Sequence, residues 1–345
     1  MKSLLLDIND YLKQTTFNVD NVYYNNIKVL NMNKKQLLNI CKDFNFSTFL
    51  TSDKSQVKLN KTKKELNINT IGISILPFSK LDNNYSIDNY SNSIQEYILN
   101  KYKMNSLIDY KIIFDFCTNS TSDCRKNCIS ETGNPMFKNA KQKAQLNRKL
   151  MFLKNTELFI AVYIAYLNYA VKNCMNKKEL LSNRYNILSD IIIENINLIY
   201  DNKKINLAKL IYNKISETKV FQNKDKIIPL KPYDYTKHYN RKELEYYKLV
   251  YSLSGFDNDK SLQAINNGLS VAMVYYNENN KPLPKTVKIN NIELKTVNGD
   301  LNDYLPLHKQ QVCVLLEYKY NRSDKKEIRQ RKLNKAILNG FVRVI

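Results

Sequence analysis

Short segments rich in β-branched and aromatic residues recur along this sequence and alternate with longer segments of helical periodicity. We predict strands at 68–77, 110–116, 184–190, 227–235, 247–252, 270–276 and 311–318. We predict helices at 93–103, 139–153, 157–174, 205–216, 261–267 and 325–338. Strands that alternate with helices are typical of α/β proteins whose strands run mainly parallel. The sequence therefore predicts an α/β fold with mainly parallel strands, which could curve into a partial barrel.

The two ends of the chain differ in character. Residues 1–65 are mixed, with a helical stripe over 1–14 and a polar, lysine-rich stretch over 54–65. No linker-like composition divides residues 105–345. We therefore expect a small N-terminal extension, 1–65, followed by one α/β domain, 66–345.

The net charge of +22 indicates a polyanionic partner. It arises from 54 Lys and Arg residues against 32 Asp and Glu residues, and it favours DNA or RNA over an anionic membrane. The alternative is compositional, because the abundant Asn, Lys, Ile and Tyr are the residues that an AT-rich coding sequence produces. Candidate phosphate contacts lie in two basic segments, with solvated helix faces as the alternative: Lys138, Lys141, Lys143, Arg148 and Lys149, then Arg329, Arg331 and Lys332.

No segment is expected to cross a membrane or direct export. The longest apolar run, 158–171, is shorter than the roughly 20 residues that a spanning helix needs. The apolar start is interrupted by Asp7 and Asp10, unlike a secretory signal. We expect a cytoplasmic protein, in a cell or in an infected host, whose six cysteines are reduced thiols or metal ligands.

Half of the cysteines follow one predicted strand, 110–116. Cys117, Cys124 and Cys128 are separated by six and then three residues, and thiolates gathered in this way bind zinc or an iron–sulfur cluster. A closed zinc site would need a fourth ligand, for which Cys174, Cys313, His238 and His308 are candidates. A [4Fe–4S] cluster with one open iron would suit radical chemistry with S-adenosylmethionine, although such enzymes usually space their cysteines by three and two residues. Separate unliganded thiols are the third alternative.

Several segments occur in the order found in one protein family. They are the cysteine spacing with its following Ile-x-x-x-Gly turn, Arg184–Asp190 (RYNILSD), Tyr233–Lys237 (YDYTK), Gly268–Tyr275 (GLSVAMVY) and Gly299–Asp300. Together they resemble the phage and plasmid proteins named after mycobacteriophage gene product 88. The resemblance extends over roughly residues 60–345. It implies a mobile-element origin and one shared site for the polar segments, but no established reaction.

Polar residues also follow the predicted strands. Asp190, Asp234, Tyr235 and Lys237 lie at or just past strand ends, as Cys117 does. Ligands of parallel α/β proteins bind where strands end, so we predict a site that these residues share. Lys237 could hold a phosphate or carboxylate, either aspartate could act as a base, and Tyr235 could stack or donate. Taken singly, such residues are often helix caps or surface pairs.

Common catalytic patterns are missing from the sequence. The six glycines form neither a phosphate-binding loop nor a dinucleotide fingerprint, and only two histidines are present. The leading hypothesis is a metal- or iron–sulfur-dependent enzyme that acts on or alongside nucleic acid. The alternatives are a nucleic-acid-binding replication or packaging factor with structural zinc and a virion accessory protein.

Overall fold

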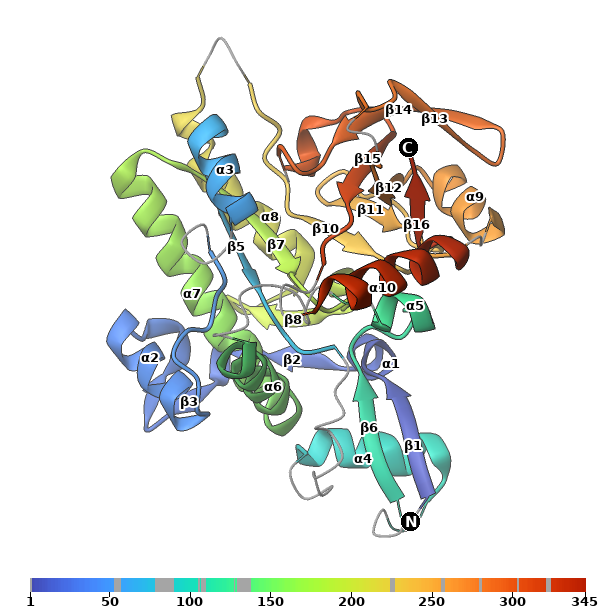
Figure 1. The fold of residues 1–345 in the computed structure, drawn as a ribbon. Coiled ribbons are helices and arrows are strands. Elements are labelled where there is room, and N and C mark those ends of the chain that lie inside the picture. The colour runs from blue at the N-terminus through green and yellow to red at the C-terminus, as the bar shows by residue number, and fades with distance from the viewer. Residues whose placement is uncertain are drawn as a thin grey trace.

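The computed structural model has an α/β fold with mainly parallel strands, as predicted (Figure 1). It describes residues 2–52, 57–77, 90–104, 106, 110–126, 128, 138–223, 227–255, 258–278, 281–302, 304–320 and 324–345. The helices in these ranges are α1 Ile8–Gln14, α2 Lys34–Asp43, α3 Val57–Leu66, α4 Asn92–Tyr102, α5 Ser122–Lys126, α6 Lys138–Lys154, α7 Thr156–Lys177, α8 Leu207–Ser216, α9 Asn258–Asn266 and α10 Lys326–Leu338.

The described strands form five sheets. The largest has seven strands in the order β10 Tyr233–Thr236, β11 Lys248–Ser252, β12 Ser270–Tyr276, β15 Val312–Glu317, β14 Ile292–Asn298 and β13 Thr286–Ile289, with β16 Val342–Val344 beside β12. Only β13 runs antiparallel in this sheet. The others are β1 Lys2–Asp7 with β6 Tyr110–Asp115, β5 Ile68–Ile73 with β7 Leu180–Asn186, β2 Thr16–Asn18 with β8 Asn197–Tyr200 and β9 Lys203–Asn206, and β3 Tyr23–Tyr24 with β4 Ile27–Lys28.

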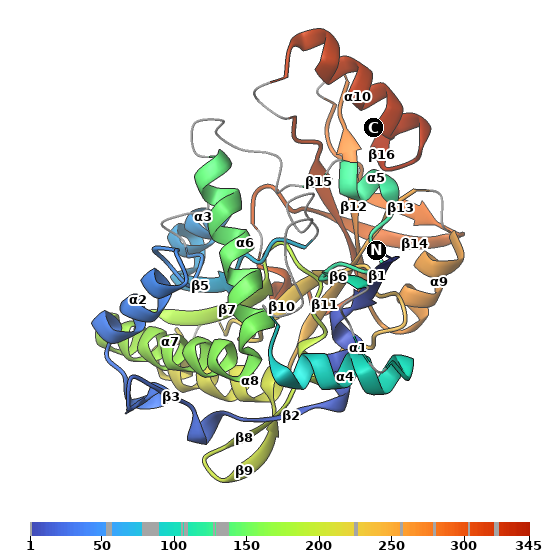
Figure 2. The same cartoon turned by 90° about the horizontal axis from the view of Figure 1, so that it is seen from below.

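Neighbouring sheets meet near the carboxyl ends of their strands. Phe116, just after β6, donates its N–H to Pro77 O at 3.0 Å, which joins the ends of β6 and β5. β7 in turn packs against β10, the edge strand of the large sheet (Figures 1 and 2). The strands described are thus divided among separate sheets and do not close into one barrel.

The first 65 residues are part of the same body. β1 pairs in parallel with β6, from Lys2 opposite Tyr110 to Asp7 opposite Asp115. Buried side chains of α1 and α2 join the main hydrophobic core, which also contains α7. The expected boundary at residue 65 therefore does not correspond to a division of the fold. The helix that we expected over 1–14 starts only at Ile8, after β1.

Helix α7 crosses the centre of the molecule. The helix begins after an N-cap residue, Asn155, whose side chain accepts the N–H of Leu158 at 2.9 Å. Glu157 lies in the first turn, where a negative charge is favourable. The helix has 22 residues and is apolar enough to span a membrane by length and composition alone, but 72% of its apolar window is buried inside the protein. It is packed as a core helix.

Candidate functional site

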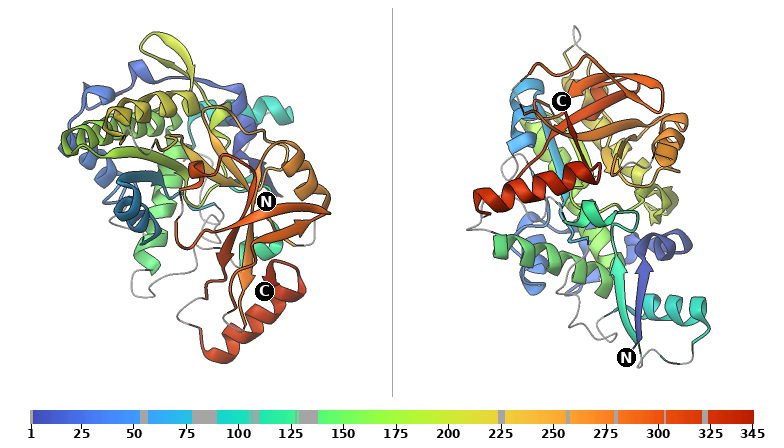
Figure 3. Two further views of the ribbon diagram at one scale, coloured as in Figure 1. Left: turned by 90° about the horizontal axis from the view of Figure 1, so that it is seen from above. Right: turned by 45° about the vertical axis from the view of Figure 1, so that its right-hand side comes forward.

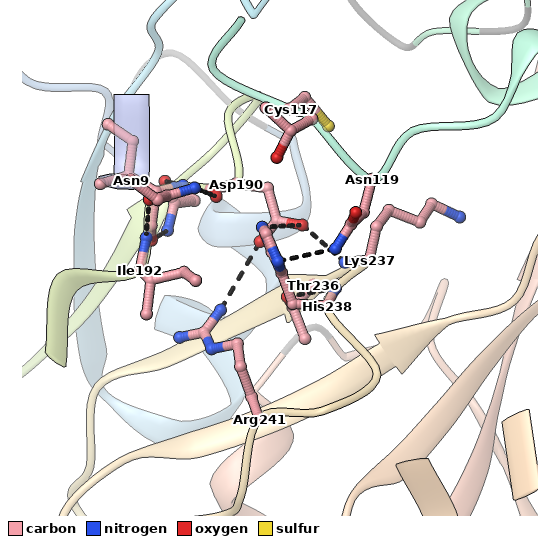
Figure 4. A network of polar contacts seen from close by, with 12 residues as sticks. Asn9, Cys117, Asn119, Asp190, Ile192, Thr236, Lys237, His238 and Arg241 are labelled. Carbon is pink, nitrogen blue, oxygen red and sulfur yellow. Dashed lines mark hydrogen bonds and ion pairs between the residues drawn. The ribbon is translucent and has the colours of Figure 1, made fainter. Parts of the chain in front are cut away.

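Three loops that follow parallel strands meet in one polar centre (Figure 4). They carry Cys117 after β6, Asp190 after β7 and Lys237 after β10. The Asp190 N–H donates to Phe116 O at 2.7 Å, and the Lys237 N–H donates to Asp190 Oδ2 at 2.6 Å. Asp190 therefore contacts both the end of β6 and the loop after β10, whereas the predicted site also included Asp234 and Tyr235.

Asp190 lies between two buried side chains that the sequence patterns did not single out as catalytic. Arg241 Nη1 lies 3.5 Å from Asp190 Oδ1, and His238 Nε2 lies 3.8 Å from Asp190 Oδ2. All three side chains are more than nine-tenths buried. Asp190 Oδ1, His238 Nε2 and Arg241 Nη1 have no hydrogen-bond partner within the described part of the chain. Buried polar atoms are rarely left in this state, because each costs about 1–3 kcal/mol.

Arg241 is held from its other side by Glu194. Its Nε and Nη2 donate to the two carboxylate oxygens of Glu194, each at 2.7 Å. Burial acts to lower the pKa of the Arg241 guanidinium, but Glu194, Tyr247 and Asp190 outweigh it and raise that pKa. The centre therefore contains a permanently charged guanidinium next to Asp190.

His238 connects this buried centre to the surface. Its Nδ1 lies 2.7 Å from Asn119 Nδ2, and Asn119 is exposed on the loop that follows β6. If the amide nitrogen donates, Nδ1 is the acceptor and Nε2 carries the proton that faces Asp190. The loop is also held by a hydroxyl contact between Thr121 and Ser254, which follows β11.

The predicted roles of Lys237 and Asp234 do not fit their contacts. Lys237 Nζ donates to Ser252 O at 2.6 Å and to Leu253 O at 3.1 Å, so two of its three protons stabilise the end of β11. Asp234 is fully buried and accepts from the Asn186 N–H at 2.8 Å, the Asn186 amide at 3.0 Å and the Tyr247 hydroxyl. Both side chains thus join strands.

Tyr235 contacts Arg184 of β7 through its ring. The Arg184 guanidinium stacks over its ring, with 4.7 Å from Cζ to the ring centroid. Tyr235 and Arg184 therefore form a cation–π pair between β10 and β7.

The three clustered cysteines form no disulfide and are half-buried. Helix α5 contains Cys124 but ends at Lys126, so the helical spacing that would align Cys124 with Cys128 is not formed. Within the described ranges, no three His, Cys, Asp or Glu side chains lie close enough together to hold a metal ion. The residues as arranged do not fit a three-thiolate site.

The surroundings of Cys117 are acidic. Burial raises the pKa of its thiol well above the ordinary value, and Asp190, Cys124 and Asp115 raise it further. Asp115 is itself held by Arg125, whose Nη2 lies 2.7 Å from the Asp115 carboxylate. Cys117 is therefore a protonated thiol in this arrangement.

The comparison with protein families identifies the chain's relatives. The family model described as gene product 88 matches residues 78–333, well over half of the 345-residue chain. The chain belongs to the gene product 88 family. No curated protein and no solved structure gives a significant match.

In this gene product 88 family member, two of the matching segments build the polar centre. Asp190 ends the first, 184–190, and Lys237 ends the second, 233–237. Sequence reasoning named His238 only as a fourth metal ligand and missed Arg241 and Asn119 as site residues. The sequence offered one sign of a role for His238 and Arg241, which is that they lie one and four residues after the second segment.

The two basic segments divide between interior and surface. Arg148 and Lys149 are buried, which contradicts their predicted phosphate contacts: Arg148 donates to Thr48 O and Ser74 O, and Lys149 Nζ lies 5.3 Å from the Phe116 ring centroid. Lys141 and Lys143 are exposed on α6, while the Lys138 side chain lies outside the described set.

Helix α10 is the more exposed basic element. Arg331, Lys332 and Lys335 are exposed, and Arg329 is half-buried. A groove of about 830 Å³ runs along this helix, and its described lining residues are Lys326, Glu327, Gln330, Arg331, Asn334, Lys335 and Leu338. Lys332 pairs with Asp324 at 2.7 Å, so part of the charge on this helix is balanced.

Proposed function

We propose that this gene product 88 family protein binds nucleic acid on the face formed by α5, α6 and α10. The observation that carries the proposal is the position of these basic helices around the strand-end centre. α5 lies beside α10, and α6 is on the same side of the molecule (Figures 1 and 2). A phosphate backbone on this face would pass over the loop that contains Asn119.

Side-chain contacts of α5 and of the strand after α10 reach that centre. The α5 residue Arg125 bonds Asp115 and Ser120, at the end of β6 and in the loop after it. On the other side, Arg343 after α10 donates to Gly255 O at 3.2 Å, next to the Ser254 that contacts Thr121. These contacts connect α5 and the strand after α10 to the loops that carry the centre.

Charge reversal on α10 tests the proposal. Arg331→Glu with Lys335→Glu should weaken binding of a fluorescein-labelled duplex, measured by anisotropy at several salt concentrations. If both cations contact phosphate, the slope of log K against log salt should fall in magnitude by about 2. Lys35→Glu with Lys42→Glu, on exposed positions of α2 away from α10, makes the same charge change and should leave the slope unchanged. An equal loss of duplex affinity in both double variants would show that only the net charge of the protein matters, which would contradict a binding face on α10.

An enzyme centre at the strand ends is the second candidate. It is favoured by three buried atoms that make no hydrogen bond within the described chain, Asp190 Oδ1, His238 Nε2 and Arg241 Nη1. It is also favoured by Cys124, which lies close enough to Cys117 to add to the rise in the pKa of the Cys117 thiol. A metal that these thiols bound would supply Lewis-acid or redox chemistry there, but the side chains as arranged gather no ligand set for it. The residues' own contribution would be proton transfer between Asp190, His238 and a bound hydroxyl or water.

Metal content separates the versions of this second candidate. The wild type and Cys124→Ala would be purified anaerobically, followed by metal analysis and a visible spectrum. About four irons with sulfide, lost in the variant, would favour the cluster and radical-type chemistry. One zinc without a visible band, also lost in the variant, would favour structural zinc. A wild-type protein that contains no metal would exclude both the iron–sulfur and the zinc hypotheses and leave a metal-free centre.

A further inference from the structure

Tyrosine and lysine side chains gather where α8, the 3₁₀ helix Glu217–Phe221 and the loop between β10 and β11 meet. We call the set of Lys209, Tyr212, Lys219 and Tyr246 the tyrosine–lysine surface. Lys209 Nζ lies 5.2 Å from the Tyr212 ring centroid and 4.8 Å from that of Tyr246. Lys219 Nζ lies 5.0 Å from the Tyr212 centroid and donates to its hydroxyl at 3.3 Å. Within the described chain, Tyr212 therefore has two ammonium groups near its ring and Tyr246 has one.

The two rings lie close to each other and are held differently. Their centroids are 6.2 Å apart and their planes are inclined by 47°. Tyr246 packs against the main hydrophobic core, which fixes its ring. Tyr212 is half-buried, and within the described chain its ring belongs to no hydrophobic cluster. Tyr212 thus presents aromatic surface that the core does not use.

Several lysines lie near these rings, together with Glu194, which adds to burial in raising the pKa of the Tyr246 hydroxyl. Lys219 is exposed, and Lys203 and Lys204 are exposed on β9, which packs against α8. The nearby Glu217 is balanced by Lys214 at 3.2 Å. Aromatic rings with interleaved ammonium groups match a ligand that alternates flat bases with phosphates.

We propose that the tyrosine–lysine surface binds single-stranded nucleic acid. Lys209 and Lys219 lie over the rings in the unbound protein, so they swing aside to hold the adjoining phosphates while unpaired bases stack on Tyr212 and Tyr246. A duplex does not suit this surface, because its base faces are covered by their neighbours in the stack. The surface lies on the opposite side of the molecule from α10 (Figures 2 and 3). The inference shares with the proposed function only the class of partner, nucleic acid.

Substitution of Tyr212 tests the inference. The probe is a short fluorescein-labelled oligothymidylate, with its duplex on oligoadenylate as the second ligand, and anisotropy gives both dissociation constants. Base stacking on one aromatic side chain contributes about 1–3 kcal/mol, so Tyr212→Ala should weaken single-strand binding about tenfold or more. Tyr212→Phe keeps the ring and should bind within about twofold of the wild type. Duplex binding should change in neither variant.

A matched control is present on α7. Tyr169 is an exposed tyrosine with one lysine over its ring, Lys34 at 5.3 Å from the centroid. Tyr169→Ala should leave single-strand binding unchanged, and a loss equal to that of Tyr212→Ala would overturn the inference. An unchanged affinity in Tyr212→Ala would also overturn it. The α10 double variant answers a separate question: if it weakens duplex binding while Tyr212→Ala has no effect, the proposed function stands without this surface.

Discussion

The main-chain N–H of Lys237 donates a 2.6 Å hydrogen bond to Asp190 Oδ2, which joins the loop after β10 to the loop after β7. The other carboxylate oxygen of Asp190 faces Arg241 Nη1 at 3.5 Å. One buried carboxylate thus fixes two strand-end loops and balances the charge of Arg241. Positioning of the site and stability of the fold therefore depend on the same residue.

Asp190→Asn should destabilise the protein through the loss of this charge. The amide oxygen can still accept from Lys237, but Arg241 loses one of its two carboxylate neighbours in a buried setting. We expect a fall of about 2–4 kcal/mol in the free energy of unfolding, measured with urea at neutral pH.

The same substitution at Asp10 is the control. Asp10 pairs with Lys101 at 2.6 Å, but its side chain is 52% exposed, so Asp10→Asn should cost about 1 kcal/mol or less. Equal effects at the two positions would contradict the structural role of Asp190.

Asp234 should make stability depend on pH. Burial raises the pKa of this carboxyl from 3.8 to about 6. The folded protein therefore holds the proton more tightly than the unfolded chain, and this stabilisation is present below about pH 4 and is lost as pH rises through about 6. Relative to Asp234→Asn, the wild type should lose about 3 kcal/mol of unfolding free energy between about pH 4 and about pH 7.

Urea unfolding of both proteins across this pH range gives the difference directly. The amide in Asp234→Asn meets the same three donors at every pH, so its own cost is constant and cancels. A difference between the two proteins that does not change with pH would show that Asp234 keeps an ordinary pKa in the folded state.

β12 and α7 could be predicted from local pattern because each is mostly apolar along its length, whereas β7 has buried polar residues and covers 180–186 instead of the predicted 184–190. β12 spans 270–276 as predicted, and α7 starts at the N-cap that Asn155 provides. β1 could not be predicted in this way, because the run Leu4–Leu6 fits a helix as well as a strand. Only its pairing with the distant β6 makes it a strand. The hairpin β13–β14 was missed although Asn290 and Asn291, with φ of 49° and 66°, carry a turn signal.

In the candidate site, too, features set by local sequence could be predicted and features set by distant contacts could not. Asp190 and Lys237 could be placed together, since the carboxyl ends of parallel strands share an edge. Arg241 could not, because the Glu194 that holds it is distant in sequence and on a different loop. Spacing predicted that Cys124 and Cys128 share a helix face, but α5 ends between them.

Arg148→Lys should affect stability and not nucleic-acid binding. The Arg148 guanidinium is buried and reaches two separate carbonyls, Thr48 O and Ser74 O, which one ammonium group cannot do with the same geometry. We expect a loss of about 1–3 kcal/mol in the free energy of unfolding. Lys143→Ala, an exposed substitution on the same helix, should change stability by about 0.5 kcal/mol or less. Weakened duplex binding in folded Arg148→Lys would instead restore its predicted role as a phosphate contact.

Gly72 should tolerate no side chain at all. It lies where β5 shifts register against β7, and a Cβ atom there would stand 1.9 Å from Arg184 O and 2.8 Å from the Ile187 side chain. The first neighbour is main chain and cannot rotate away, so Gly72→Ala must push the two strands apart just before Asn186 and Asp190. We expect more than about 4 kcal/mol of destabilisation or a failure to fold.

Gly268→Ala is the comparison, because Gly268 has φ of +89° but nothing within 4 Å of a new Cβ. It should cost only the about 1–2 kcal/mol of an unfavourable backbone conformation. Thermal unfolding of both variants, with the yield of soluble protein as a second readout, separates steric conflict from backbone strain. A Gly72→Ala protein as stable as Gly268→Ala would contradict the close approach of β5 and β7.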